Sequence, residues 1–204
     1  MITKVQGKTL AGEIGVRREP CLTPVEKAML KWVVVDPEDR LLDANIGSGS
    51  MAEYLRRNMP CDVCGVSENM EDVRKARSKL RGSDIVYASG GEIPWKDDAF
   101  DTVLFRMDGS DRESTIRRLK EVRRVLRPGG QLVVGALCLP WPMASLATKA
   151  AEERLEEKYW FSKKELAELL EALAYEGLSW QRTGLGTGVM TAWKHKPDAR
   201  EAFR

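Results

Sequence analysis

Short apolar runs alternate with longer amphipathic stretches between residues 40 and 137. The apolar runs are bounded by turn-forming residues and predict strands at residues 40–44, 62–66, 84–88, 100–106 and 131–137. The stretches between them predict helices at residues 50–58, 70–80 and 111–126. Because each pair of parallel strands needs a crossover, this alternation favours a parallel sheet with helices on both faces.

A further helix is expected ahead of the first strand. Thr23 suits the N-cap, Pro24 the first helical position, and Glu26 the reciprocal position of a capping box. The apolar side of this helix runs to Trp32 and Val33, and Asp36-Pro37 is expected to end it. Residues 1–22 contain glycines without a period and predict an irregular N-terminal arm, which leaves 23–204 as a single domain.

The C-terminal third departs from the alternating pattern. Pro128-Gly129-Gly130 is expected to end the 111–126 helix, and residues 144–158 predict a charged helix. Ser162 and Glu165 predict a second capping box, at the start of a helix with leucines on its buried side. Two last strands, at 178–183 and 189–194, are separated by a glycine-rich turn and predict a hairpin.

The candidate ligand site is the turn after the first predicted strand. Leu41-Leu42 ends in Asp43, and the chain then passes through Asn45, Gly47 and Gly49 into a helix. Glycines let the backbone approach a ligand closely, and parallel sheets bind ligands beyond the carboxyl ends of their strands. Two glycines in a turn are equally compatible with a connection that binds nothing.

Composition gives few further constraints on function. The chain has 204 residues and a formal charge of +2, so its bulk electrostatics demands neither nucleic acid nor an anionic membrane. With no secretory pattern and no apolar stretch of about 20 residues, we expect a cytoplasmic protein without a membrane span. Cys61 and Cys64 form a C-x-x-C, but residues three apart on a strand point to opposite faces, so we predict reduced thiols and no metal.

The most specific motif spans the fourth and fifth predicted strands. Phe100-Asp101-Thr102-Val103 is followed by Leu126-Arg127-Pro128-Gly129-Gly130, and Ile93-Pro94-Trp95 precedes both. These segments resemble the "LPF…FDxV…VLKPGG" pattern of the class I S-adenosylmethionine-dependent methyltransferases, especially the type 11-like branch that modifies small molecules. The resemblance covers residues 25–195 and implies an α/β fold with a Rossmann-like, seven-stranded, mostly parallel sheet and a C-terminal antiparallel hairpin.

The resemblance also implies S-adenosylmethionine as cofactor and assigns its binding residues one by one. Asp43 matches the acid that orders the glycine loop and the methionine end of the cofactor. Gly47 and Gly49 match the second and third glycines of that loop, whereas Asn45 replaces the first. Asparagine tolerates a left-handed backbone better than most residues, so the turn is expected to survive this replacement.

The position that holds the ribose hydroxyls also departs from the family. Relatives use an acid there because a carboxylate accepts two hydrogen bonds at once. In this chain the position falls on Ser67, with Glu68 beside it. A shift of one residue would bring Glu68 into use, against the alternation by which adjacent strand residues face opposite ways.

The adenine and methyl ends of the cofactor are assigned in the same way. The acid that accepts a bond from the adenine amino group is replaced by Ser89, which is followed by Gly90. Serine can still accept one hydrogen bond. Arg106 and Met107, at the end of the fourth predicted strand, would lie beside the cofactor and the transferred methyl group.

Three cofactor contacts are thus altered together: Asn45, Ser67 and Ser89. Losing two charge-assisted hydrogen bonds at about 1.5–3 kcal/mol each would weaken cofactor binding by about two to four powers of ten, unless Glu68 or backbone groups compensate. Two hypotheses follow. Either the chain transfers methyl from S-adenosylmethionine to a small molecule, or it keeps the fold with weakened or lost cofactor binding and acts as a binding partner or regulator.

The Asn45 replacement makes a testable prediction. If asparagine is only a tolerated substitute for glycine, Asn45→Gly should keep or tighten the affinity for S-adenosylmethionine, measured by isothermal titration. A large loss of affinity would instead make the Asn45 side chain a required contact.

Methyl transfer mainly requires a positioned acceptor and needs no fixed catalytic triad, so the catalytic residues stay unassigned. Candidate bases are Asp108 and Asp111, or Glu13 and Glu19 if the N-terminal arm closes over the site, although each also suits a solvated acid or a helix cap. The apolar segment 140–143 suits an acceptor or homodimer contact, or simply a packed loop.

A basic run lies on the helix predicted at 111–126 and just beyond it: Arg112, Arg117, Arg118, Lys120, Arg123, Arg124 and Arg127. Such a run could meet an anionic partner. Because aromatic residues for stacking bases are absent and a charged helix face is usually solvated, a nucleic-acid partner is disfavoured.

Overall fold

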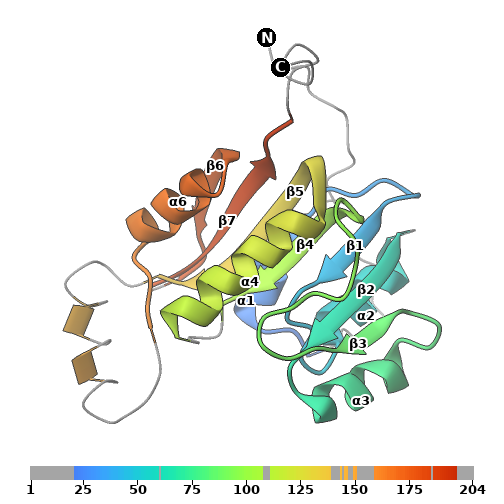
Figure 1. Cartoon of the computed structure of the whole chain (residues 1–204). Coiled ribbons are helices and arrows are strands. Elements are labelled where there is room, and N and C mark those ends of the chain that lie inside the picture. Colours follow the sequence, from blue (N-terminus) through green and yellow to red (C-terminus); the bar gives the residue numbers. More distant parts are fainter. Residues whose placement is uncertain are drawn as a thin grey trace.

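A seven-stranded sheet runs through the molecule in the order β3-β2-β1-β4-β5-β7-β6 (Figure 1). This computed structural model describes residues 21–59, 61–107, 111–138, 159–184 and 186–196, with 143, 145, 146, 149 and 150. The strands are β1 (Arg40–Asp43), β2 (Asp62–Ser67), β3 (Ile85–Tyr87), β4 (Phe100–Arg106), β5 (Leu126–Leu137), β6 (Tyr175–Arg182) and β7 (Thr187–Lys194). The first five are parallel, and β7 is antiparallel to both β5 and β6. The predicted fold class is confirmed.

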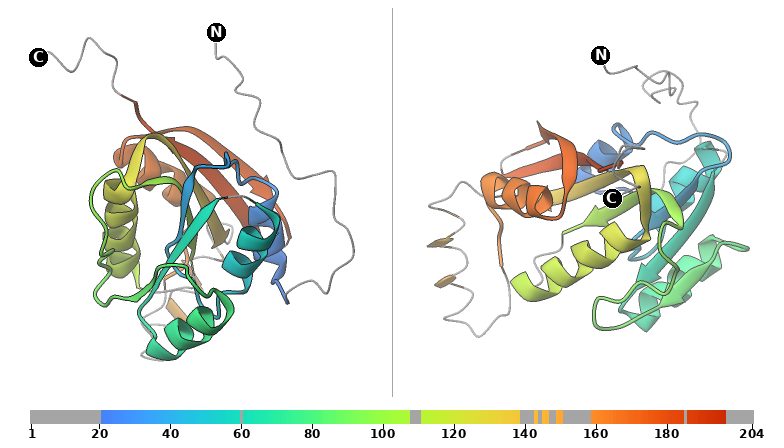
Figure 2. Two further views of the ribbon diagram at one scale, coloured as in Figure 1. Left: turned by 90° about the vertical axis from the view of Figure 1, so that its right-hand side faces the viewer. Right: turned by 45° about the horizontal axis from the view of Figure 1, so that its top comes forward.

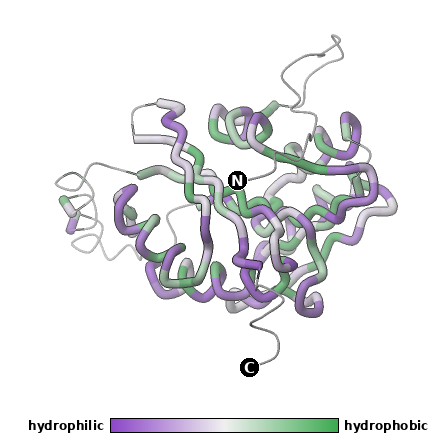
Figure 3. The backbone as a smooth tube through the Cα atoms, turned by 90° about the horizontal axis from the view of Figure 1, so that it is seen from above, coloured by the Kyte–Doolittle hydropathy of each residue, from purple (hydrophilic) through white to green (hydrophobic). Residues whose placement is uncertain are grey.

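Helices cover both faces of the sheet, as the alternation predicts. They are α1 (Pro24–Leu30), α2 (Ser50–Asn58), α3 (Met70–Lys79), α4 (Arg112–Val125) and α6 (Lys163–Ala172). One apolar cluster unites α4 and α6 with the sheet, and a second unites α1, α2 and α3 with its other face. Figure 2 shows α4 and α2 on opposite sides of the sheet. Figure 3 shows hydrophilic and hydrophobic residues alternating along the helical tubes, as two-sided helices require.

Both predicted capping boxes are present. The Thr23 hydroxyl accepts from the Glu26 amide at 3.2 Å, and the Glu26 carboxylate accepts from the Thr23 amide at 2.7 Å. Ser162 and Glu165 make the same reciprocal pair at the start of α6. Each box satisfies backbone donors that a helix N-terminus otherwise leaves unpaired.

Helix α1 ends at Leu30, earlier than the predicted stop at Asp36-Pro37. The three valines that follow are β-branched and favour an extended backbone over a helical one. The Val34 amide donates to the Gln131 side chain at 3.0 Å, and the Thr102 hydroxyl donates to the Val34 carbonyl at 3.2 Å. Trp32, expected on the buried side, therefore lies beyond the helix and is 37% exposed.

Strand β5 begins earlier than the predicted Gln131. Helix α4 ends at Val125, and Leu126 is already extended and paired with Phe100. The next pair joins Thr102 to Gln131, so the Pro128-Gly129-Gly130 segment forms an irregularity in the strand rather than the end of the helix. Gly129 has a φ of 77°, a conformation that glycine adopts without steric cost.

The C-terminal hairpin is confirmed, with β6 and β7 each longer than predicted. The helix expected at 144–158 lies mostly outside the described residues, as does the arm at 1–20. Within the described part of the chain, no helix has both the length and the apolar content needed to cross a membrane.

Candidate functional site

The turn between β1 and α2 needs glycine at two positions. Gly47 has a φ of 50° and Gly49, the N-cap of α2, has a φ of 77°. A Cβ atom on Gly49 would lie 2.9 Å from the Cβ of Ala76 in α3, too close for a real contact. Both a left-handed backbone and close packing against α3 therefore require this glycine.

Asp43, the last residue of β1, is completely buried. Its Oδ1 accepts from the Asn45 amide at 3.2 Å, whereas its Oδ2 is buried with no hydrogen-bond partner in the described part of the chain. Burial raises the pKa of this carboxyl group, and the Arg106 charge and the Asn45 N–H partly oppose that effect. An unpartnered buried carboxylate oxygen is unusual and fits a site that receives a cationic or N–H donor.

Asn45 ties the turn to the end of β4. Its side-chain amide donates to the Arg106 carbonyl at 3.2 Å. Among the described non-glycine residues, a positive φ occurs only at Asp98 and Ala174. Asn45 is therefore not left-handed, and the argument that asparagine survives here by tolerating that conformation is wrong. Its replacement by glycine would remove the bond to Arg106, and the effect on cofactor affinity stays a prediction.

The Arg106 side chain lies over the glycine turn. Its guanidinium donates to the Asn45 carbonyl and forms an ion pair with Glu26 of α1. A Cβ atom on Gly47 would lie 3.1 Å from the Arg106 Nη2. Glu26 is buried, and its role here adds to the capping role that the sequence predicts. Met107, expected beside the cofactor, packs against the apolar cluster of α4 and α6, and its amide donates to the Gly135 carbonyl at 2.8 Å.

A cavity of about 340 Å³ opens beside this turn. It lies at the carboxyl ends of β1, β2 and β4 and against the first turn of α4, where the switch point of the sheet predicts a ligand. Its lining combines carboxylates, hydroxyls, an amide and one guanidinium: Ala44, Asn45, Ser67, Glu68, Asn69, Asp72, Phe105, Ser114, Thr115 and Arg118. The structure thus brings three of the predicted site residues together here, namely Asn45, Ser67 and Glu68.

Ser67 and Glu68 both line this cavity, against the expectation that adjacent residues face opposite ways. The reason is that β2 ends at Ser67, so strand alternation no longer applies to Glu68. The Ser67 hydroxyl accepts from the Asn69 amide at 3.0 Å. Glu68 Oε1 accepts from the Gly91 amide at 2.9 Å and pairs with Arg118, while no described residue bonds its Oε2.

Arg118 is a site residue that sequence reasoning missed. It lies on α4, its side chain is only 10% exposed, and it reaches both Glu68 and the Glu92 carbonyl. In the sequence it is one member of a basic run, with no signal to separate it from its exposed neighbours. Ser114 and Thr115 were missed for a similar reason, because small polar residues in a first helical turn are common.

Comparison with known proteins shows what kind of domain carries this site. A sequence profile described as "Methyltransferase domain" matches residues 42–134, from β1 into β5. Residues 42–134 are therefore similar to methyltransferase domains. The match includes the glycine turn, the 340 Å³ cavity and the Phe100–Gly130 motif.

Individual relatives cover different shares of the chain. An uncharacterised protein of Methanocaldococcus jannaschii is 25% identical over 153 residues, or 72% of this chain and 69% of that protein. A phthiotriol/phenolphthiotriol dimycocerosates methyltransferase of Mycobacterium tuberculosis is 37% identical over 95 residues. That alignment covers 45% of this chain but only 35% of the mycobacterial enzyme, so it concerns the domain and not the whole protein.

Solved structures agree on the fold. The crystal structure of a SAM-dependent methyltransferase from Methanosarcina mazei superposes with a TM-score of 0.66, covering 80% of this chain and 95% of that one. At 22% sequence identity this likeness establishes the fold. The chain therefore has the class I methyltransferase fold.

Seven predicted cofactor residues lie outside the cavity lining: Asp43, Gly47, Gly49, Ser89, Gly90, Arg106 and Met107. Ser89 and Gly90 are exposed in the loop after β3. Gly90 has a φ of 71°, with open space around it, and its carbonyl accepts from Arg117 at 3.3 Å. The loop approaches the cavity through Gly91 instead, because the Gly91 amide binds Glu68.

Of the four candidate bases, only Asp111 lies among the described residues. Asp111 is the N-cap of α4 and accepts from the Ser114 amide at 2.9 Å. Hydrogen bonds from Ser114 lower its pKa, so it is a cap and a poor proton acceptor. Asp108, Glu13 and Glu19 lie outside the described residues.

Part of the basic run on α4 is engaged in ion pairs within the fold. Arg118 pairs with Glu68, Arg124 with Glu121 and Asp97, and Arg127 with Asp101. The pairs with Glu68, Asp97 and Asp101 join α4 and the start of β5 to neighbouring loops and to β4, whereas the Arg124–Glu121 pair lies within α4. The run is therefore partly neutralised by the fold.

Proposed function

We propose that the methyltransferase domain binds S-adenosylmethionine at the 340 Å³ cavity and transfers its methyl group to a small-molecule acceptor. The observation that carries this proposal is the buried Asp43 carboxylate, which has an unpartnered Oδ2 at the switch point of the sheet. A partly unsatisfied buried carboxylate suits a ligand that brings a positively charged group. The profile match at residues 42–134 supports the same assignment.

The residues present fit this cofactor. Asp43 would receive its amino group, and the turn at Gly47 and Gly49 admits a ligand close to the backbone. Glu68, whose Oε2 bonds no described residue, would accept the ribose hydroxyls in place of Ser67. When bound, the cofactor supplies an electrophilic methyl group on a sulfonium, and the domain has mainly to position the acceptor in line with it.

Isothermal titration with S-adenosylmethionine and, separately, S-adenosylhomocysteine tests the proposal. We expect one site per chain with a micromolar dissociation constant. No heat and no thermal shift at millimolar ligand would overturn it.

Glu68→Gln gives a sharper test of how the cofactor is held. Removing the charge should weaken S-adenosylmethionine binding about tenfold, because one charge-assisted hydrogen bond becomes a neutral one. Ser67→Ala, the matched neighbour, should change affinity less than threefold or so, since the Ser67 hydroxyl already binds the Asn69 amide. A larger loss of affinity for Ser67→Ala than for Glu68→Gln would contradict this assignment. It would indicate that Ser67, at the position that relatives use, holds the ribose hydroxyls.

A second candidate function follows from Arg106. Its guanidinium covers Gly47 and is held by the buried Glu26, an arrangement that also suits a domain that has lost its cofactor and acts as a binding partner or regulator. The same titration separates the two candidates.

The four cysteines are unpaired, which supports a reducing compartment, so we place the protein in the cytoplasm.

A further inference from the structure

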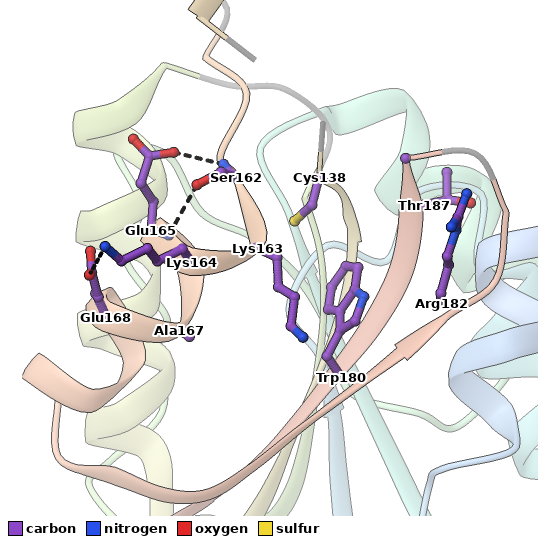
Figure 4. Close-up of a pocket in the computed structure, with 11 residues that line it drawn as sticks. Cys138, Ser162, Lys163, Lys164, Glu165, Ala167, Glu168, Trp180, Arg182 and Thr187 are labelled. Atoms are coloured by element: carbon purple, nitrogen blue, oxygen red, sulfur yellow. Dashed lines mark hydrogen bonds and ion pairs between the residues drawn. The ribbon is translucent and has the colours of Figure 1, made fainter. Parts of the chain in front are cut away.

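A second and larger cavity lies beside strands β5, β6 and β7, with a volume of about 1090 Å³ (Figure 4). Its walls are the end of β5, the hairpin strands β6 and β7, and the first turns of α6. Its lining includes Cys138, Lys163, Trp180, Arg182 and Thr187. None of these residues belongs to the cofactor site proposed above.

Two cations face this second cavity without acidic partners. Lys163, at the first position of α6, makes no hydrogen bond or ion pair with any described residue, and Figure 4 shows its side chain directed toward the Trp180 ring. On the opposite wall, Arg182 donates through Nε to the Gly184 carbonyl at 3.1 Å. No described residue bonds its two terminal nitrogens, so both positive charges are available to a ligand.

The acids of the second cavity are already committed. Glu165 closes the capping box with Ser162 and accepts from the Tyr159 hydroxyl at 2.8 Å. Glu168 pairs with Lys164 at 3.5 Å, and Figure 4 shows Lys164 directed at Glu168, away from Trp180. The unbalanced charge in the lining is therefore positive, which favours an anion.

An apolar wall stands between the two cations. A Cβ atom on Gly188 would lie 2.2 Å from the Trp180 ring, so the missing side chain lets the indole lie across β7. Cys138 adds a buried sulfur, and burial raises the pKa of its thiol to about 12. It therefore acts as a neutral, apolar surface and not as a nucleophile.

We infer that this cavity binds an organic anion with a flat apolar body, stacked on Trp180 and with its acid group between Lys163 and Arg182. We assign this cavity to the end of the methyl acceptor that lies away from the methylated atom. This assignment rests on the proposed methyl transfer. Arg106 at the end of β4 pairs with Gly135, three residues before Cys138, so both cavities open at the same edge of the sheet. Phe105 of the first cavity and Cys138 of the second also belong to one apolar cluster, on the α4 and α6 face.

Titration with two probes that share the indole ring and differ in the terminal group tests the inference. Indole-3-acetate carries the acid, and indole-3-ethanol is its neutral analogue. We expect the full chain to bind the acetate at least about tenfold more tightly than the alcohol. The double variant Lys163→Gln/Arg182→Gln should lose about tenfold for the acetate and stay within about twofold for the alcohol, whereas Lys164→Gln, the matched control, should change neither.

Three outcomes would overturn the inference: no acetate binding at millimolar concentration, equal binding of acetate and alcohol, or unchanged acetate binding by the double variant. S-adenosylmethionine titration of the same preparations distinguishes this failure from failure of the proposed function. A chain that binds the cofactor but not the acetate refutes only the second site. A chain that binds the acetate but not the cofactor keeps the anion site and refutes its assignment to a methyl acceptor.

Discussion

Asp43→Ala is expected to weaken S-adenosylmethionine binding by about a hundredfold, the cost of roughly 3 kcal/mol when a buried charge-assisted hydrogen bond is lost. Asp43 is fully buried, and its Oδ2 has no other partner in the described part of the chain. The truncation also removes the acceptor of the Asn45 amide and so loosens the turn. Isothermal titration gives the affinity, and circular dichroism verifies that the variant is folded.

Asp43→Asn is the matched variant, because it keeps an acceptor for the Asn45 amide while removing the charge. We expect a smaller loss of cofactor affinity, about tenfold. If Asp43→Ala and Asp43→Asn both bind as tightly as the unmodified chain, the buried carboxylate has no role toward the cofactor and the central support for the proposed function is gone.

The stabilities of Asp43→Asn and of the unmodified chain are expected to depend differently on pH. Burial raises the pKa of Asp43 in the folded state, so the folded chain holds this proton more tightly than the unfolded chain does. The stability contributed by this group is therefore fully present below the ordinary carboxyl pKa and is lost as pH rises through the raised value. Without ligand, the stability of Asp43→Asn relative to the unmodified chain should increase from pH 4 to pH 7, measured by urea unfolding. A constant difference would contradict this assignment.

Gly49→Ala is expected to lower the free energy of unfolding by about 3 kcal/mol. A left-handed backbone at a non-glycine residue costs about 1 kcal/mol, and overpacking against α3 costs about 2 kcal/mol more. Both conditions hold here, because the φ is 77° and the added Cβ would lie 2.9 Å from that of Ala76. Since the turn would have to shift, cofactor binding should fall as well.

Gly90→Ala is the control for the Gly49 prediction. Its φ of 71° is nearly the same, but no atom lies within 4 Å of the added Cβ. It should therefore cost only the backbone penalty of about 1 kcal/mol. Urea unfolding of both variants separates the two effects, and an equal loss at the two positions would show that packing against Ala76 contributes nothing.

Most of the fold could be predicted from the sequence because its signals are local. Helix α2 and strand β4 have the predicted bounds, Ser50–Asn58 and Phe100–Arg106. Both capping boxes depend on residues three apart, and such contacts form whatever the rest of the chain does. The errors occur where a distant partner decides the conformation, as when Leu126 pairs with Phe100 instead of extending α4.

The candidate site was less predictable because its contacts join distant parts of the chain. Arg106 lies 80 residues from Glu26, and Arg118 lies 50 residues from Glu68. No local pattern distinguishes these arginines or acids from exposed ones. Lys163, Trp180 and Arg182 likewise share a cavity only because α6 packs beside the hairpin.

By itself the sequence determined the strand order along the chain, the glycine turn after Asp43 and the motif that places the chain near the methyltransferases. Periodicity, helix caps and backbone preferences act over a few residues, and the order of residues specifies them directly. Only the tertiary structure decided that Glu68 lines the cavity beside Ser67 with a free Oε2, that Arg106 covers Gly47, and that two cations flank Trp180. These features depend on side-chain packing between elements, where burial and sheet topology, not neighbouring residues, choose the partners.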